Sequence, residues 1–163
     1  IDFDLVDENE ERIRYDFNYR SKATLLVFYR GAWSRYCRKY ISALNQQRFE
    51  FEELGVTLLF ISTDNPEVSR KLRDGVGVSY PLLSDPDHRV ADIYDVPIAL
   101  KHPKSKKYAN GFSQPALFLH KNESVPYHWI SQPRMFNGWG AFDRPKPYDL
   151  LKNFYQRFDS EKP

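Results

Sequence analysis

Two runs of strand-forming residues flank the most regular helical pattern in the chain. The runs cover Thr24–Tyr29 and Val56–Ile61, and strands that are apolar on both faces are typical of the centre of a parallel sheet. Between them lies a row of positions spaced by three and four, made of Tyr40, Ile41, Leu44, Gln47, Phe51 and Leu54. This row predicts one long amphipathic helix over residues 36–54, and Gly55 stands where a left-handed residue would end it. Strand, helix and strand together have the length of a parallel crossover, which predicts an α/β fold.

Other elements are predicted on both sides of this unit. Alternating polarity in Phe3–Asp7 and Arg12–Tyr15 indicates a peripheral β-hairpin. After the second buried run, a helix capped by Asp64 or Asn65 should begin at Pro66 and end near the two glycines that follow. The remaining pattern predicts, in order, a short edge strand over Tyr80–Leu83, a helix started by Asp85 and Pro86, a loop over 96–113, a hairpin of 116–120 with 127–130, a loop over 132–147 and a helix over 148–158.

These elements predict a single domain over residues 1–163. Its expected class is α/β, with a mixed central sheet flanked by helices and an N-terminal β-hairpin. The loop over 96–113 holds the only basic cluster, which is interpreted as a solvated surface or, alternatively, as a contact for an anionic partner. The loop over 132–147 has three open roles: it packs the last helix, which ranks first, covers a site, or forms an association surface.

Composition narrows the range of functions. The 163 residues carry 24 basic and 22 acidic side chains, so a net charge of +2 gives no field that would attract nucleic acid or a membrane surface. No apolar run approaches the roughly 20 residues of a membrane-spanning helix. The single cysteine, Cys37, excludes an intramolecular disulfide and a thiolate zinc site. The four histidines lack ligand spacing, so we predict no metal and no other cofactor.

The cysteine content also bears on location. One unpaired thiol suits a reducing compartment, and we expect a cytoplasmic protein. The chain begins at Ile1 without a secretory pattern, which leaves open whether preceding residues were removed.

The candidate chemistry lies in Phe28–Cys37, the segment that joins the first buried strand to the long helix. Cys37 falls in the first turn of that helix, where free backbone N–H groups and the positive end of the helix dipole favour a thiolate over a thiol. Arg30 and two further arginines nearby add positive charge. Ser34, three residues before the thiol, either caps the helix or places its hydroxyl beside the sulfur.

This segment resembles the active site of the peroxiredoxins, which place Thr or Ser three residues before the peroxidatic cysteine. Phe28-Tyr29 followed by Ser34-x-x-Cys37 matches that pattern, and segments starting at Ile61, Tyr80 and Ile93 are similar to family segments in order and spacing. The resemblance covers roughly residues 3–130. The sequence from Phe28 to Trp33 most resembles an AhpC/TSA-type, peroxiredoxin-like subgroup whose members often carry Trp-Cys-x-x-Cys. In this chain Ser34 stands in place of the first of those cysteines. The resemblance implies a thioredoxin-like fold.

The resemblance also implies a reaction. The Cys37 thiolate would attack a hydroperoxide and become a sulfenic acid, with Ser34 orienting the peroxide. The candidate substrate-binding residues are Arg30, Trp33, Gln114 and Pro115. Because the chain has no second cysteine, an external thiol, either glutathione or a thioredoxin-like protein, would reduce the sulfenic acid. The implied protein is a single-cysteine, thiol-dependent antioxidant peroxidase, and its oligomeric state is left open.

Some positions depart from the family pattern. Peroxiredoxins carry a proline where this chain has Arg30, and their catalytic arginine maps onto Gln114, which has no charge to stabilise a leaving oxygen. Arg30 is the candidate to compensate. Pro115 matches instead the proline that thioredoxin-fold proteins hold in the cis form beside the active site.

These departures support a rival hypothesis from a different class, a redox-inert binding module in which Cys37 is a packed remnant. A transferase acting on glutathione adducts would use the same nucleophile. The enzymatic hypotheses require a sulfur that solvent can reach, whereas a sulfur buried among apolar neighbours favours the inert module.

Overall fold

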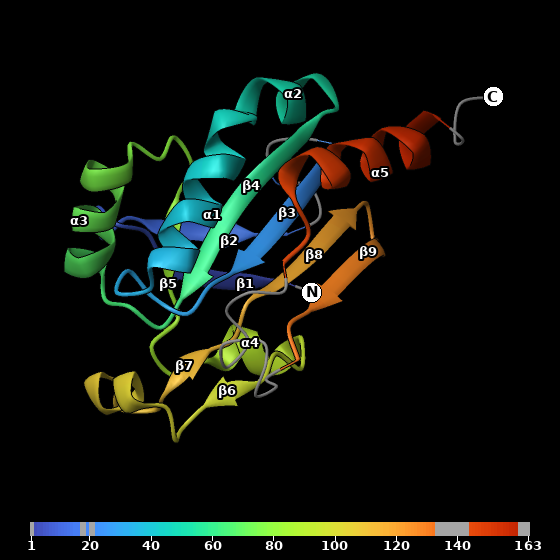
Figure 1. Ribbon diagram of the computed structural model, residues 1–163. Coiled ribbons are helices and arrows are strands. Elements are labelled where there is room, and N and C mark those ends of the chain that lie inside the picture. The colour runs from blue at the N-terminus through green and yellow to red at the C-terminus, as the bar shows by residue number, and fades with distance from the viewer. Residues whose placement is uncertain (1, 17–18, 20–21, 133–143, 160–163) are drawn as a thin grey trace.

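The computed structural model describes residues 2–16, 19, 22–132 and 144–159 (Figure 1). Its strands are β1 (Phe3–Val6), β2 (Arg12–Tyr15), β3 (Ala23–Phe28), β4 (Val56–Ser62), β5 (Leu82–Ser84), β6 (Ile98–Ala99), β7 (Phe112–Ser113), β8 (Ala116–Lys121) and β9 (Ser124–Ile130). Its helices are α1 (Arg35–Gln46), α2 (Arg48–Glu53), α3 (Pro66–Val76), α4 (Arg89–Ile93), a 3₁₀ helix (Pro103–Lys107) and α5 (Pro147–Asp159). No helix in these described ranges is long and apolar enough to cross a bilayer.

The main sheet is mixed and has the strand order β2-β1-β5-β4-β3-β8-β9 within the described residues. Strands β3, β4 and β5 run parallel, while β1 and β8 run antiparallel to their neighbours β5 and β3. The predicted crossover and both predicted hairpins are confirmed. The edge position predicted for Tyr80–Leu83 is wrong, because the N-terminal hairpin joins that side of the sheet through the pair Val6 and Ser84. Phe3 and Tyr15 bury the apolar side of the hairpin there.

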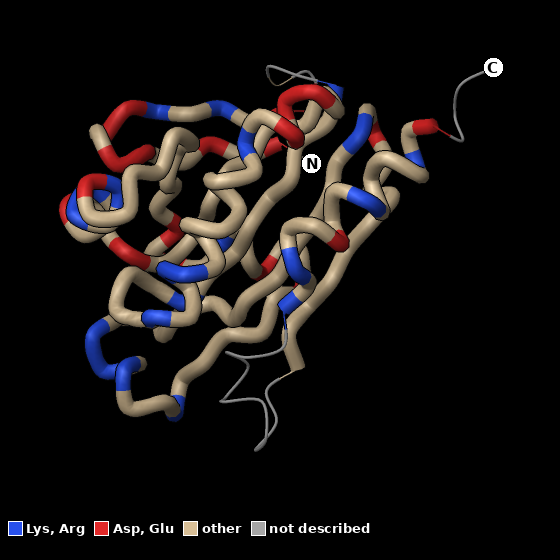
Figure 2. Tube along the Cα trace, turned by 45° about the horizontal axis from the view of Figure 1, so that its top comes forward, with Lys and Arg blue, Asp and Glu red and all other residues tan. Residues whose placement is uncertain are grey.

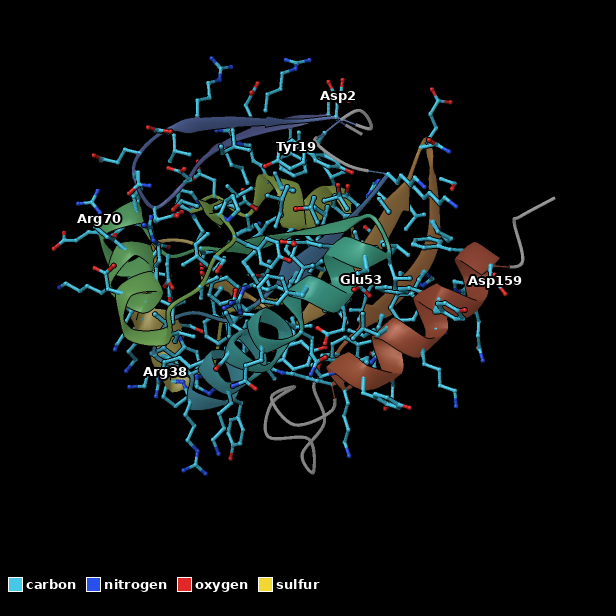
Figure 3. All side chains as sticks on the ribbon, turned by 90° about the horizontal axis from the view of Figure 1, so that it is seen from above. Asp2, Tyr19, Arg38, Glu53, Arg70 and Asp159 are labelled. Carbon is cyan, nitrogen blue, oxygen red and sulfur yellow. The ribbon has the colours of Figure 1, made fainter. Side chains whose placement is uncertain are left out.

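Helices cover both faces of this sheet. In Figures 1 and 3, α1, α2 and α5 lie on one face, whereas α4 lies on the other. Alternate residues of β3 face the two layers: Leu25 and Val27 join the core under α1 and α5, and Leu26 and Phe28 join the core that includes α4. Cys37 belongs to the first of these layers.

The predicted helix over residues 36–54 is two helices, α1 and α2, separated at Gln47. The backbone N–H of Gln47 bonds to the carbonyl of Leu44 at 3.1 Å, which tightens the turn, and the Arg48 guanidinium donates to the carbonyl of Asn45 at 3.1 Å. Gln47 is the polar member of the predicted apolar row, so no apolar side chain at that position holds a continuous helix against the core.

Local capping predictions can be checked directly. Asn65 rather than Asp64 caps α3, since its side chain accepts from the N–H of Val68 at 3.0 Å. Gly77 ends α3 in the left-handed conformation. The start predicted at Asp85 and Pro86 is too early, because α4 begins at Arg89 with His88 as its N-cap residue; Asp85 accepts hydrogen bonds from the N–H groups of Val90 and Ala91 in the first turn.

Two predicted loops differ in outcome. The segment 96–113 contains the short pair β6–β7 and the 3₁₀ helix, which the sequence prediction missed because elements of two to five residues show no periodicity. The basic residues of this segment lie along one projecting loop, at the lower left of Figure 2. Of the loop predicted over 132–147, residues 133–143 lie outside the described part of the chain.

Candidate active site

The end of β3 and the start of α1 place Cys37 in the first turn of the helix, as predicted. Ser34 is the N-cap residue, and its Oγ accepts from the backbone N–H of Cys37 at 3.3 Å. The guanidinium of Arg38 donates to the carbonyl of Ala32 at 2.6 Å and so closes the loop that precedes the helix. Of the two roles considered for Ser34, the structure shows the capping of the helix.

The sulfur is buried, contrary to the requirement that solvent reach it. Cys37 is 0% exposed and belongs to the same apolar cluster as Tyr29 and Ile41. Two N–H donors nevertheless point at Sγ: the backbone N–H of Arg30 at 3.4 Å and Nη2 of Arg144 at 3.0 Å. These two donors distinguish Cys37 from a cysteine that is surrounded by apolar groups alone.

Arg144 comes from the segment before α5 and was not predicted. Tyr40 on α1 holds this segment, because its Oη donates to the carbonyl of Pro145 at 2.5 Å and its ring centre lies 5.4 Å from Cζ of Arg144. Burial raises the pKa of the Tyr40 phenol, so it acts as a neutral donor near pH 7. Arg144 and Cys37 are 107 positions apart, and no local spacing in the sequence signals the contact.

Arg30 contributes to the site mainly through its backbone. Its side chain is 2% exposed and its guanidinium lies 5.0 Å from the ring centre of Trp33 and 5.1 Å from that of Phe112. Burial lowers the pKa of Arg30, while the nearby Cys37 acts in the opposite direction. Two predicted substrate-binding residues, Arg30 and Trp33, therefore pack against each other beside the Cys37 loop.

Gln114 and Pro115 precede β8, whose first residue, Ala116, pairs with Phe28 at the end of β3. They therefore lie near the end of β3 from which the Cys37 loop starts. Gln114 is 4% exposed, and its Oε1 has no hydrogen-bond partner among the described residues. The predicted cis form at Pro115 is wrong: the peptide bond is trans. The carbonyl of Pro115 accepts from the N–H of Ser131, so the chain already runs extended into the β8–β9 ladder at this point.

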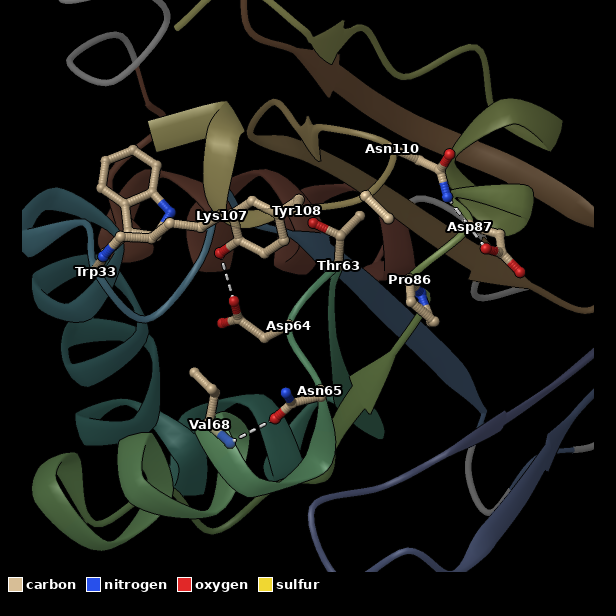
Figure 4. A pocket seen from close by; sticks show the side chains of 11 residues that line it. Trp33, Thr63, Asp64, Asn65, Val68, Pro86, Asp87, Lys107, Tyr108 and Asn110 are labelled. Carbon is tan, nitrogen blue, oxygen red and sulfur yellow. Dashed lines mark hydrogen bonds between the residues drawn. The ribbon is translucent and has the colours of Figure 1, made fainter. Parts of the chain in front are cut away.

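Trp33 also lines a cavity of about 340 Å³ (Figure 4). Asp64 sits in its wall and accepts from Oη of Tyr108 at 2.5 Å and from the N–H of Ala32 at 2.8 Å. Burial raises the pKa of Asp64, partly offset by these two hydrogen bonds. A Cβ on Gly31 would collide with the Tyr108 hydroxyl, so only glycine allows this close approach. Asp64 thus fixes the loop before Cys37, a role that differs from the predicted helix cap.

Comparison with known proteins shows the family of this chain. The profile of the AhpC/TSA family matches residues 1–127, which include the β3–α1 junction and its cysteine. The chain belongs to the AhpC/TSA family. Among curated relatives, peroxiredoxin Bcp of Escherichia coli K12 is 30% identical over 94 residues, which are 58% of this chain and 60% of that protein. The chain therefore spans about three fifths of the length of that relative.

Solved structures of the family share the fold of this AhpC/TSA protein. Peroxidoxin BcpB of Mycobacterium tuberculosis matches with a TM-score of 0.74 and 19% identity, over 100% of this chain and 95% of that one. The reduced 2-Cys peroxiredoxin of Plasmodium vivax matches with a TM-score of 0.75 and 20% identity, over 100% and 94%. The predicted thioredoxin-like fold is confirmed. Arg144 lies beyond the segment that the AhpC/TSA profile matches.

Proposed function

We propose that this AhpC/TSA protein is a thiol-dependent peroxidase that reduces hydroperoxides through Cys37. The observation that carries the proposal is the pair of N–H donors on Sγ, from Arg144 and from the backbone of Arg30, at the N-terminus of α1. Both donors stabilise negative charge on sulfur, and the thiolate is the form that attacks a peroxide. Arg144 supplies the positive charge that Gln114 lacks.

The reaction has two stages. In the first, the Cys37 thiolate forms an S–O bond with the terminal oxygen, the O–O bond breaks, and the departing oxygen leaves as an alcohol or water after taking up a proton. The guanidinium of Arg144 stabilises the charge that moves from sulfur to the departing oxygen. In the second, an external thiol attacks the sulfenic sulfur and releases water, and another thiol then breaks the mixed disulfide to restore Cys37.

The other predicted site residues keep their proposed roles around this reaction. Ser34 holds the helix start that carries the sulfur and orients the peroxide, and the substrate contacts come from Arg30, Trp33, Gln114 and Pro115. The reductant is glutathione or a thioredoxin-like protein. A thiol that must remain reduced between turnovers fits a reducing compartment such as the cytoplasm.

One observation favours the inert binding module as a second candidate: Cys37 has no exposed surface. In that case the thiol would react only after unfolding, because reagents would not reach it in the native state. Alkylation of the native protein over a range of pH separates the two functions, since a peroxidase cysteine is modified without unfolding.

The direct test is a titration with hydrogen peroxide in the presence of a sulfenic-acid trap, followed by mass spectrometry. We expect one trapped adduct on Cys37, formed well above the rate of free cysteine, and no adduct in Cys37→Ser. An oxidation rate no faster than that of free cysteine would exclude the peroxidase function.

A further inference from the structure

Arg144 also lines a surface hollow, of which Cys37 is not a lining residue. Its volume is about 350 Å³, and its walls include Tyr36, Lys39, Tyr40 and Ala43 of α1 together with Arg144 and Lys146 of the segment before α5. The α1 residues are spaced by three and four, so they share one face of the helix. Cys37 follows Tyr36 directly in the first turn of the same helix.

The walls of this hollow carry three cationic side chains. Lys39 and Lys146 are exposed, and Arg144 is half-buried. No carboxylate lines the hollow among the residues that the structure describes. Cations that converge on a concave site without a neighbouring carboxylate attract an anion, and the guanidinium and ammonium groups suit a carboxylate.

Arg144 links the hollow to the reactive sulfur. The same guanidinium lines the hollow and donates through Nη2 to Sγ of Cys37 at 3.0 Å. Its Nε has no hydrogen-bond partner among the described residues, so the donor set of the guanidinium is incomplete. A carboxylate bound in the hollow would therefore sit one side chain away from the sulfur.

We infer that this hollow binds the carboxylate of a small anionic thiol that reduces oxidised Cys37. The inference rests on the proposed function, because a sulfenic acid on the one cysteine of this chain has to be reduced by a thiol that the chain does not supply. The hollow has the size of a small-molecule site. In the step it serves, the thiol sulfur bonds to the sulfenic sulfur of Cys37, the S–O bond breaks, and the oxygen leaves as water with the thiol proton.

The first experiment compares a charged thiol with a neutral analogue. Cys37 is oxidised with hydrogen peroxide, and its reduction is followed by rapid quench with glutathione or with glutathione diethyl ester. We expect glutathione to be preferred, and Lys39→Gln and Lys146→Gln each to weaken that preference about fivefold, the effect of one nearby charge in a hydrated site. Lys152→Gln, an exposed lysine of α5 that does not line the hollow, is the matched control and should keep the full preference.

A second experiment measures binding without chemistry. S-methylglutathione, which carries the carboxylates but no reactive thiol, is titrated into Cys37→Ser and followed by NMR. We expect shifts in residues around the hollow that saturate with ligand and are lost in the Lys39→Gln, Lys146→Gln double variant. Shifts that are absent, or unaffected by the double variant, would overturn the inference.

The possible outcomes separate this inference from the proposed function. If hydrogen peroxide gives no sulfenic acid, the peroxidase function fails at once. If sulfenic acid forms but glutathione and its ester reduce it equally in all variants, only the hollow's role fails. A carboxylate could also belong to the peroxide, so oxidation by a fatty-acid hydroperoxide is compared with tert-butyl hydroperoxide. A lysine dependence confined to that oxidation step would assign the hollow to the peroxide and overturn the inference.

Discussion

Replacing Arg144 with methionine tests whether its guanidinium drives the reaction of Cys37. Arg144→Met keeps an unbranched side chain of moderate length but removes the charge that lies 3.0 Å from Sγ. Because the thiolate and the departing oxygen would both lose this stabilisation, we expect slower oxidation by hydrogen peroxide. Arg144→Lys keeps the charge without the planar fork and should lose less.

The size of the effect follows from the contact. A hydrogen bond to a charged group is worth about 1.5 to 3 kcal/mol. Two unit charges about 4 Å apart gain roughly 1 kcal/mol in water and about 4 kcal/mol near a protein surface. Since Arg144 is half-buried, we take about 1 to 3 kcal/mol, which corresponds to a rate about 5- to 150-fold lower.

The assay is stopped-flow oxidation of the reduced protein, with the sulfenic acid confirmed by trapping and mass spectrometry. Arg35→Met is the matched control. Arg35 is exposed in the same first turn of α1, and its guanidinium donates a hydrogen bond to the Tyr36 hydroxyl and not to the sulfur. We expect less than about a twofold change for that variant. Equal rates in Arg144→Met and the wild type would refute the role of the contact. Equal slowing in Arg144→Met and Arg35→Met would show that the loss of any nearby positive charge, and not of this contact, slows the reaction.

Three further predictions concern the loop before Cys37 and the acid dependence of the fold. Ser34→Ala removes the cap on the N–H of Cys37 and should cost about 1 kcal/mol, seen as a melting temperature lower by roughly 2–4 °C; an unchanged melting temperature would mean that the cap contributes nothing. Gly31→Ala should destabilise the protein in urea unfolding because its methyl group meets the Tyr108 hydroxyl, and the loss should be smaller when the background is Tyr108→Phe instead of the wild type; an equal loss in both backgrounds would count against that steric account. Burial lowers the pKa of His120 to about 4 from 6.5. Between these two pH values the unfolded chain binds a proton that the folded chain does not. The free energy of unfolding should therefore fall by up to about 3 kcal/mol as the pH is lowered from 6.5 to 4. In His120→Gln this part of the acid dependence should be missing.

The parts of the fold that depend on neighbouring residues could be predicted from the sequence. The strand, helix and strand unit between Thr24 and Ile61 is visible because each element carries its own periodicity. The position of Cys37 at the start of α1 follows from the same local pattern. Ser34 was recognised as a possible cap for the same reason, since its partner is only three residues away.

Features that depend on tertiary contacts could not be predicted. The place of β5 between β4 and β1 depends on where the N-terminal hairpin docks. The contact between Arg144 and the sulfur is the extreme case, because loop closure over such a distance leaves no trace in local composition.

The cation beside Cys37 comes from a segment of the chain that is distant from the cysteine in sequence. The AhpC/TSA profile ends at residue 127, and Arg144 reaches the sulfur from beyond that limit. A survey of relatives confined to the matched region would therefore score this protein as missing its guanidinium. A classification of family members as active or inactive should instead ask which side chain contacts the sulfur in the folded protein, whatever its position in the alignment.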